Sequence, residues 1–411
     1  MKLPFWPNPI GYRDIDLKLF RVFALLERLG NPHLKLPPTI HIAGTNGKGS
    51  TLAFLKAIFN EANFTTHTYT SPHLVNFNER IILADKEISD DFLNEILQKC
   101  KIAAELKPEI KVTYFEGITV AAFLAFSQIK ADILLLETGM GGRLDATNVL
   151  PEVLCSIITP ISLDHQEFLG NTIKKIAAEK AGIIKKNCPT IIAPQEDEAL
   201  LAITKEAQKL NSKIINLDEK FLNSEVNLIG NHQKYNAALA ATVAISQSKF
   251  KISEEQIKIA LKKAKWPARL EEINSGNLHK ILNKNQKLFL DGSHNLAGAK
   301  TIKEFLQNQE KLRKKIAIFA MLQDKDCEGF LNEIKNEIDE LIILEITGET
   351  KSRKTNEIEE IAKKLNIKSQ ISKNLESALK LAKKIDENSL IIICGSLYQA
   401  GFFLQENINK I

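Results

Sequence analysis

The chain has 411 residues, of which 44% are hydrophobic and 26% are charged, and its 55 Lys and Arg against 50 Asp and Glu give a net charge of +5. This length predicts two domains, because a single hydrophobic core stops growing at about 250–300 residues. The apolar content excludes a disordered chain, and the balanced charge argues against a nucleic-acid binder, whose basic residues gather into a patch.

The five cysteines are odd in number and widely spaced, and no Cys-x-x-Cys pair occurs. This argues against a disulfide framework or a thiolate zinc site and is typical of a reducing compartment. No signal-peptide core follows Met1, and no run approaches the ~20 apolar residues of a membrane span. We therefore expect a cytoplasmic protein with no membrane or nucleic-acid partner.

Short β-branched runs alternate with amphipathic segments, which predicts an α/β fold with a mainly parallel sheet covered by helices. A second alternating series begins near Lys287 and predicts a smaller doubly wound domain. The run 118–126, ITVAAFLAF, fits a strand or a buried helix, and its alanines favour the helix. The polar segment 272–284 is the predicted linker. Predicted strands are 39–43, 133–136, 153–158, 190–193, 287–290, 315–321, 341–346 and 390–394, and predicted helices include 50–60, 90–106 and 172–180.

The segment 44–51, GTNGKGST, lies between a predicted strand and a predicted helix. Its glycines allow backbone N–H groups to curl around phosphate oxygens, and the helix N-terminus adds partial positive charge. Lys48 supplies a cation for the outer phosphates, and a hydroxyl of Ser50 or Thr51 can reach Mg²⁺. The first two glycines are too close together for the usual Walker spacing, so a purely structural turn is the alternative. The strand–loop–helix context favours nucleotide binding.

Two further predicted strands end in polar residues. The strand at 133–136 runs into Glu137 and a glycine-rich turn, and the strand ending at Ile158 is followed by Asp164 and His165. Ligands of parallel sheets bind outside the carboxyl ends of strands, so Glu137 is a candidate metal carboxylate. Helix capping by Glu137, a structural role for His165 and a solvated Lys180 are the alternatives when each residue is considered alone.

The ordered motifs GTNGKGS, TSPHL, FE-x-x-T, GMGGRLDATN, LDH-x-x-x-LG-x-T, EKAGI, R-L-E, DG-x-HN and GSLY, from about Ile40 to Gly401, resemble the dihydrofolate synthase/folylpolyglutamate synthase family of the Mur ligase superfamily. The resemblance implies an ATP- and pterin-binding Mur-ligase-like domain at 1–276, with a P-loop. A smaller Rossmann-like domain at 277–411 is expected to close over the active site. DG-x-HN contains Ser293 where the family commonly has Ala, which we expect to be tolerated.

The resemblance also implies roles for individual residues. Lys180 matches a lysine that is often carbamylated in the family, which gives it a reason to lie beside a metal, and His294 is a plausible partner of the incoming glutamate or of the transferred phosphate. The implied ATP-binding residues are Gly47, Lys48, Gly49, Ser50, Asn236, Arg269 and Asp291; the Mg²⁺ residues are Ser71, Glu137 and His165; and the dihydropteroate residues are Thr113, Tyr114, Phe115, Glu116, Leu144, Asp145 and Ala146.

The implied activity is ATP-dependent ligation of L-glutamate to dihydropteroate and to reduced folates through an acyl phosphate, with two Mg²⁺ ions and a monomeric enzyme. GRLDATN resembles the bifunctional bacterial members. A polyglutamylating enzyme without dihydropteroate activity, another Mur-type amino-acid ligase and a switch NTPase are the alternatives. The sequence leaves open the number and linkage of added glutamates, carbamylation of Lys180 and a monovalent-ion requirement.

Overall fold

The computed structural model describes residues 4–7, 17–310 and 313–408, and it divides into two compact units. The first unit comprises Met1–Asn227 and His232–Lys265, and the second comprises Leu228–Asn231 and Trp266–Ile411. The chain thus enters the second unit at Leu228–Asn231, returns to the first, and passes finally to the second at Trp266, whereas the predicted boundary is after residue 276. Every helix of the described part is too short or too polar to cross a bilayer.

An eight-stranded sheet forms the centre of the first unit, in the order β4-β3-β2-β5-β1-β6-β7-β8. The six strands β2, β5, β1, β6, β7 and β8 are parallel to one another. The hairpin of β3 and β4 is antiparallel, and its strand β3 pairs with β2. The bounds are β1 (Thr39–Ala43), β2 (Thr66–Tyr69), β3 (Ile81–Leu83), β4 (Lys86–Glu87), β5 (Ile133–Glu137), β6 (Cys155–Ile158), β7 (Thr190–Ile192) and β8 (Ile214–Asn216).

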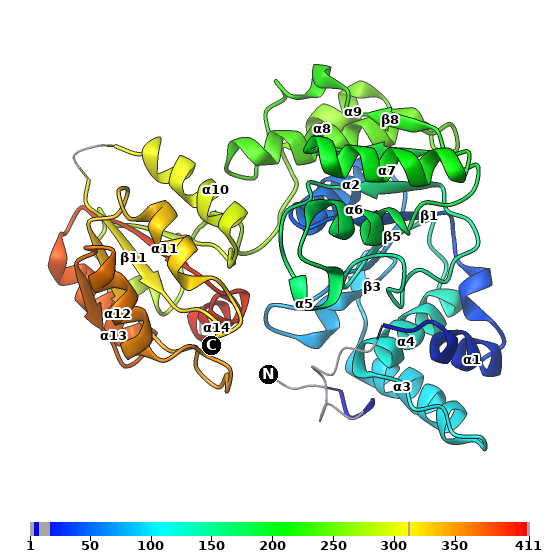
Figure 1. Ribbon diagram of the computed structural model, residues 1–411, viewed down its shortest axis with the longest axis horizontal. Coiled ribbons are helices and arrows are strands. Elements are labelled where there is room, and N and C mark those ends of the chain that lie inside the picture. Colours follow the sequence, from blue (N-terminus) through cyan, green and yellow to red (C-terminus); the bar gives the residue numbers. More distant parts are fainter. Residues whose placement is uncertain (1–3, 8–16, 311–312, 409–411) are drawn as a thin grey trace. The chain divides into compact units, whose positions relative to one another are not determined.

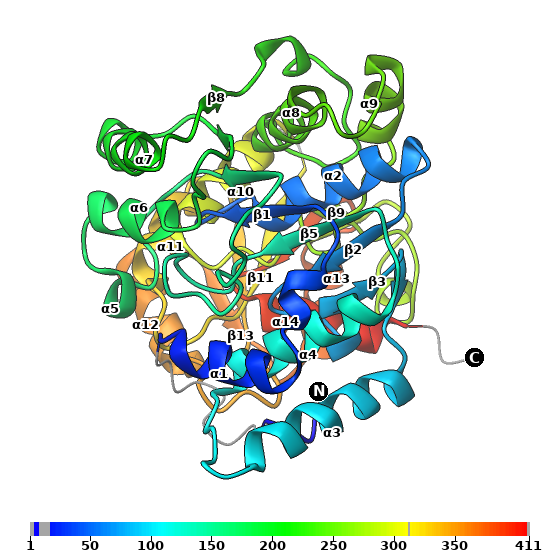
Figure 2. The same cartoon turned by 90° about the vertical axis from the view of Figure 1, so that its right-hand side faces the viewer.

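Helices cover both faces of this sheet. Figure 2 shows α1, α3 and α4 on one side and α2, α8 and α9 on the other. The first group packs on Leu134 and Leu136 of β5, whose side chains share one face because strand residues alternate. The bounds are α1 (Phe20–Arg28), α2 (Lys48–Glu61), α3 (Asp90–Glu105), α4 (Tyr114–Gln128), α5 (Gln166–Leu169), α6 (Ile173–Ala181), α7 (Asp197–Lys209), α8 (Asn231–Ser246) and α9 (Glu254–Leu261).

The second unit is built on a six-stranded sheet in the order β13-β12-β11-β14-β10-β9, drawn in yellow to red in Figure 1. Only β9 is antiparallel, and α10, α11 and α12 share one hydrophobic cluster with the sheet. The bounds are β9 (Glu271–Glu272), β10 (Lys287–Leu290), β11 (Lys315–Phe319), β12 (Glu340–Ile343), β13 (Ser369–Ile371), β14 (Leu390–Cys394), α10 (Leu296–Gln307), α11 (Cys327–Ile334), α12 (Thr355–Lys364), α13 (Leu375–Ile385) and α14 (Leu397–Asn407).

The run 118–126 lies inside α4, as its alanines predicted. The segment 272–284 belongs to the second unit and is not a linker between units, because β9 pairs with β10 and a 3₁₀ turn, η4 (His279–Ile281), follows. Its polar composition is that of a surface segment.

Candidate active site

The glycine-rich turn between β1 and α2 has a shape that only glycine permits at two positions. Gly44 has φ +154°, and a Cβ there would lie 1.8 Å from Thr159 Oγ1. Gly47, the residue before α2, has φ +87°, and a Cβ there would lie 2.5 Å from Asn236 Oδ1. Lys48 Nζ donates to the carbonyl oxygens of Gly44 and Thr45 at 3.1 and 3.3 Å. The lysine ammonium therefore lies over the turn that leads into the N-terminus of α2, which carries partial positive charge.

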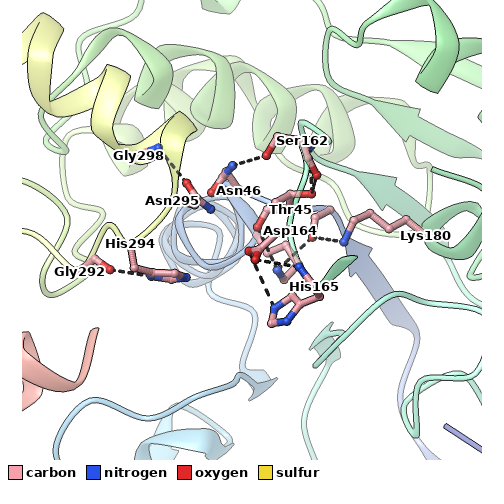
Figure 3. A network of polar contacts seen from close by, with 12 residues as sticks. Thr45, Asn46, Ser162, Asp164, His165, Lys180, Gly292, His294, Asn295 and Gly298 are labelled. Atoms are coloured by element: carbon pink, nitrogen blue, oxygen red, sulfur yellow. Dashed lines mark hydrogen bonds and ion pairs between the residues drawn. The ribbon is translucent and has the colours of Figure 1, made fainter. Parts of the chain in front are cut away.

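A second loop, which follows β6, is bound to this turn. The Thr45 and Asn46 amides donate to the carbonyl oxygen of Pro160 at 3.0 and 3.3 Å. The Thr45 hydroxyl donates to the Ser162 carbonyl oxygen and accepts from the Ser162 amide, both at 3.1 Å, and Asn46 Nδ2 donates to Ser162 Oγ at 3.1 Å (Figure 3). The loop that carries the predicted metal residue His165 is thus fixed to the glycine-rich turn.

His165 itself has a left-handed backbone, with φ 50° at the N-cap of α5. Its amide donates to Asp164 Oδ1 at 2.9 Å, and its Nε2 lies 3.9 Å from Asp164 Oδ2 (Figure 3). The imidazole is 40% exposed, so it is accessible to a ligand.

Helix α8 packs two buried amide side chains against the start of α2. Gln233 Nε2 donates to Ser50 Oγ at 3.2 Å, and Asn236 Nδ2 donates to Gln233 Oε1 at 3.0 Å. Both residues are buried, at 0% and 3% exposed. Gln233 orients the predicted ATP residue Asn236 beside Gly47, and it was not predicted as a site residue. Thr51 Oγ1, in contrast to Ser50 Oγ, is buried without a hydrogen-bond partner among the described residues.

Glu137 is the last residue of β5 and lies at the carboxyl end of the sheet, as predicted. Its Oε2 accepts a 3.4 Å hydrogen bond from the Ser71 amide, and its Oε1 lies 4.0 Å from Lys48 Nζ. The structure therefore brings the predicted residues Ser71 and Glu137 together beside the glycine-rich turn. No group of three or more His, Cys, Asp or Glu side chains forms a metal cage within the described ranges. A carboxylate beside the glycine-rich turn fits Mg²⁺, which binds through few protein oxygens together with phosphate and water.

Lys180 lies on the last turn of α6 and is only 4% exposed. Its Nζ donates to the Gly44 carbonyl oxygen at 2.9 Å (Figure 3). The pKa of Lys180 is lowered to about 7, chiefly by burial and next by the nearby Lys48 cation, whereas Asp164 and Asp145 act in the opposite direction. An ordinary lysine is almost fully protonated at neutral pH, whereas with a pKa of about 7 a large fraction of the Lys180 amine is uncharged and nucleophilic.

The turn after β5 packs backbone to backbone on the end of α6. A Cβ on Gly142 would lie 2.7 and 2.8 Å from the carbonyl oxygens of Glu179 and Lys180, and a Cβ on Gly182 would lie 2.5 Å from Arg143 Cα. The Arg143 amide donates to the Glu179 carbonyl oxygen at 2.7 Å. The two segments are therefore in direct main-chain contact.

Asp145, on the same turn, is 1% exposed and is saturated by donors from its own loop. Its Oδ2 accepts from the Met140 amide at 2.8 Å, and its Oδ1 accepts from the amide of Thr147 at 3.0 Å and from the Thr147 hydroxyl. Burial raises the pKa of Asp145, and these hydrogen bonds oppose the rise. Asp145 fixes the shape of the loop, which the sequence did not predict.

A buried histidine completes this arrangement. His41 Nε2 lies 2.8 Å from Thr147 Oγ1, and burial, followed by the charge of Lys185, lowers the pKa of His41 to about 3. Since the Thr147 hydroxyl donates its single proton to Asp145, the neutral His41 ring donates to Thr147 from Nε2. Neither His41 nor Thr147 was predicted as a site residue. The local signal for His41 was a polar side chain between the two isoleucines of strand β1.

The N-terminus of α4 brings the remaining predicted pterin residues to this loop. Thr113 is the N-cap in a reciprocal capping box with Glu116, and the Phe115 ring covers Gly139, where a Cβ would lie 2.4 Å from Phe115 Cζ. Glu116 accepts from Arg21 Nε at 2.9 Å and from Arg21 Nη2 at 2.7 Å. Tyr114 and Ala146 are buried, and Leu144 is half-buried. Arg21 is a further residue that the sequence did not predict.

In the second unit, three predicted residues follow or flank β10. Asp291 comes directly after the strand, is 2% exposed and accepts from the Ser293 amide at 2.7 Å. His294 Nδ1 donates to the Gly292 carbonyl oxygen at 3.0 Å, so its Nε2 is the basic nitrogen, and Asn295 caps α10 by accepting from the Gly298 amide at 2.9 Å (Figure 3). Arg269 precedes β9 and is half-buried.

Comparison with known proteins identifies the family. The Mur ligase middle domain model matches residues 42–220, and the model described as dihydrofolate synthetase, C-terminal domain, matches residues 274–405. A dihydrofolate synthase/folylpolyglutamate synthase of Bacillus subtilis is 35% identical over 77% of this chain and 78% of its own length. A probable dihydrofolate synthetase of Schizosaccharomyces pombe is 33% identical over 94% of this chain and 97% of its own length.

Solved structures agree with the predicted α/β, two-domain Mur-ligase fold. Mycobacterium tuberculosis folylpolyglutamate synthase complexed with ADP and AMPPCP has a TM-score of 0.84 at 26% identity and covers 95% of each chain. Escherichia coli FolC in complex with DHPP and ADP has a TM-score of 0.83 at 27% identity, over 95% of this chain and 93% of that chain. The predicted fold class and the predicted resemblance are both confirmed: this chain belongs to the dihydrofolate synthase/folylpolyglutamate synthase family.

Proposed function

We propose that this protein joins L-glutamate to dihydropteroate and to reduced folates in an ATP-dependent reaction that passes through an acyl phosphate. One observation supports this most directly. The glycine-rich turn after β1 and the Phe115–Asp145 cluster after β5 are built on strands that are neighbours in the sheet. A phosphate donor and a pterin carboxylate can therefore be held at the carboxyl ends of adjacent strands, where ligands of parallel sheets bind.

The chemistry requires activation of a carboxylate, because its hydroxide leaving group is poor. The carboxylate oxygen attacks the γ-phosphorus of ATP, the bond to the ADP oxygen breaks, and an acyl phosphate forms. The glutamate amine then attacks the acyl carbon, and phosphate leaves with the electron pair of its C–O bond. Negative charge is spread over phosphoryl oxygens in the first step, so cations placed in advance lower the barrier.

The ATP phosphates are proposed to bind to Gly47, Lys48, Gly49 and Ser50. Asn236, together with Arg269 and Asp291 of the second unit, completes the set of ATP-binding residues. Lys48 carries the positive charge for the outer phosphates, and its hydrogen bonds to the turn fix that charge before ATP arrives.

For the metal, we propose that Ser71, Glu137 and His165 hold two Mg²⁺ ions, which supply Lewis-acid stabilisation of the phosphoryl group when bound. Lys180 is proposed to be carbamylated. Its neutral amine forms an N–C bond to CO₂ and releases one proton, which converts a buried cation into a carboxylate able to bind a metal. The lowered pKa of Lys180 supports this step, since only the uncharged amine attacks CO₂.

The pterin is proposed to lie against residues 144–146 and the N-terminus of α4, that is, Thr113, Tyr114, Phe115 and Glu116. Phe115 offers a stacking face. Because Asp145 is buried and bound to its own loop, we propose that it serves the pterin chiefly by holding Leu144 and Ala146 in place. His294 is proposed to accept the proton of the glutamate ammonium at Nε2.

The test is ADP formation measured with dihydropteroate and with tetrahydrofolate, each with and without L-glutamate. ADP formation beyond one equivalent per enzyme should occur with either pterin only when glutamate is present. Glutamate-dependent activity with tetrahydrofolate but not with dihydropteroate would identify a polyglutamylating enzyme. ADP release without a pterin would indicate an NTPase. Activity restricted to a different carboxylate would identify another Mur-type ligase. We also propose a monomer, which light scattering during size-exclusion chromatography checks.

A further inference from the structure

The turn that presents Arg269 has an unfavourable backbone on both sides of the arginine. Ala268 has φ 55° and Leu270 has φ 48°, and both residues are 0% exposed. Residues with a Cβ rarely adopt the left-handed region, because the Cβ crowds the carbonyl oxygen. Such conformations persist where the surrounding structure holds them, and they concentrate at functional sites.

Two carboxylates and one amide hold this turn. Glu271 Oε2 accepts from the Ala268 amide at 2.9 Å, and Asp291 Oδ2 accepts from the Leu270 amide at 2.8 Å. The Gly292 amide donates to the Ala268 carbonyl oxygen at 3.0 Å. Both amides that flank Arg269 are thus bound by charged acceptors, which make stronger hydrogen bonds than neutral ones.

The Arg269 side chain is held by the same groups. Its Nη1 donates to the Ala268 carbonyl oxygen at 3.3 Å. A Cβ on Gly292 would lie 3.1 Å from Arg269 Nη1 and 2.4 Å from Leu397 Cδ1, so the missing side chain of Gly292 leaves the space that the guanidinium occupies. The motifs R-L-E and DG-x-HN therefore form one structural element around Arg269.

Glu271 itself has a fixed position. It is the first residue of β9 and pairs with Leu290 of β10, the residue before Asp291. The sheet thus sets the distance between the two carboxylates that bind the turn. Without the Glu271 carboxylate, the amide of the fully buried Ala268 would lose its acceptor, and the left-handed conformation would lose its support.

We propose that Glu271 is a positioning residue for the nucleotide: it holds the strained Ala268 backbone and thereby aims the Arg269 guanidinium. This inference rests on the proposed role of Arg269 in ATP binding. Glu271 acts through the arginine, so its removal should weaken nucleotide binding only while Arg269 is present.

The experiment measures the Kd of AMPPNP by calorimetry and the KM values for ATP and dihydropteroate on the full chain. Glu271→Ala should raise the Kd of AMPPNP and the KM for ATP about tenfold, as expected for one charge-assisted hydrogen bond. The KM for dihydropteroate should change less than twofold. Glu271→Gln, which keeps an oxygen acceptor, should restore most of the affinity. Glu272→Ala is the matched control, because Glu272 is the exposed neighbour in the same strand.

A double-mutant cycle with Arg269→Ala distinguishes the two proposals. In the Arg269→Ala background, Glu271→Ala should have no further effect on the Kd of AMPPNP. Additive losses, or equal losses for Glu271→Ala and Glu272→Ala, would overturn the role of Glu271. Unchanged AMPPNP affinity in Arg269→Ala alone would instead overturn the role of Arg269. If Glu271→Ala does not fold, Glu271→Asp, whose shorter side chain withdraws the acceptor, replaces it in the cycle.

Discussion

Lys180 gives the most quantitative prediction, because its ammonium group is buried. A fall in its pKa from 10.5 to about 7 corresponds, at about 1.4 kcal/mol per unit, to a destabilisation of about 5 kcal/mol when the folded protein carries the proton. Replacement by Met, which has a similar length and no charge, removes this term and also the hydrogen bond to Gly44, worth about 1–2 kcal/mol. Lys180→Met should therefore stabilise the protein by about 3 kcal/mol at pH 6 while ligase activity is lost.

The sign of the pH dependence follows from proton binding. The folded chain releases the Lys180 proton near pH 7, whereas the unfolded chain keeps it up to about pH 10.5. Between these values the unfolded state binds more protons, so this lysine makes the wild-type protein more stable as pH rises. The advantage of Lys180→Met should accordingly shrink by about 3 kcal/mol between pH 6 and pH 9.

Urea unfolding at pH 6, 7, 8 and 9, in buffers freed of CO₂ so that no carbamate forms, measures this difference. Lys174→Met, on the exposed side of the same helix, is the control and should follow the wild-type pH dependence. A Lys180→Met protein that is less stable than wild type at pH 6, or a stability difference that does not change with pH, would contradict a destabilising buried charge at Lys180.

Three further predictions concern the proposed roles. Lys48→Ala should lower kcat for ADP formation by about 100-fold or more, because the outer phosphates lose their cation, and near-normal turnover would contradict the phosphate-loop assignment. Asp145→Ala should lower kcat/KM for dihydropteroate more than for tetrahydrofolate, since it releases the loop beside the pterin; equal losses would argue against a separate pterin role. Ala268→Gly should raise the free energy of unfolding by about 0.5–1 kcal/mol, because relief of the left-handed alanine exceeds the extra entropy of unfolded glycine. Urea denaturation checks this last value, and a loss of stability would show that Ala268 is not strained.

Much of the fold could be predicted from local patterns. The strands at 287–290 and 390–394 occur where their β-branched runs predicted, because buried parallel strands leave a continuous apolar signal. The strand expected at 153–158 begins later, at Cys155. Six short strands of the described chain were not predicted: β2, β3, β4 and β9, and the edge strands β8 and β13. Edge strands are only half-buried, so they carry little apolar pattern.

The polar arrangement of the site was less predictable than its backbone. The position of Glu137 could be predicted because the end of a strand is a local feature of the sequence. The bond between His41 and Thr147 joins residues that are 106 positions apart, and no periodicity connects them. Asp145 was expected to face a ligand, yet the structure encloses its carboxylate in its own loop. Whether a carboxylate meets a ligand or a backbone amide depends on how its loop closes, and that is decided by tertiary contacts.

The main-chain contact between the Gly142 turn and the Gly182 end of α6 has a consequence for inhibitor design. Side chains change rotamer, but no side chain separates these two segments. The spacing between the turn that carries Asp145 and the helix that carries Lys180 is therefore set by peptide geometry. A compound that contacts both segments can therefore be built on a rigid connector, which loses less conformational entropy on binding than a flexible one.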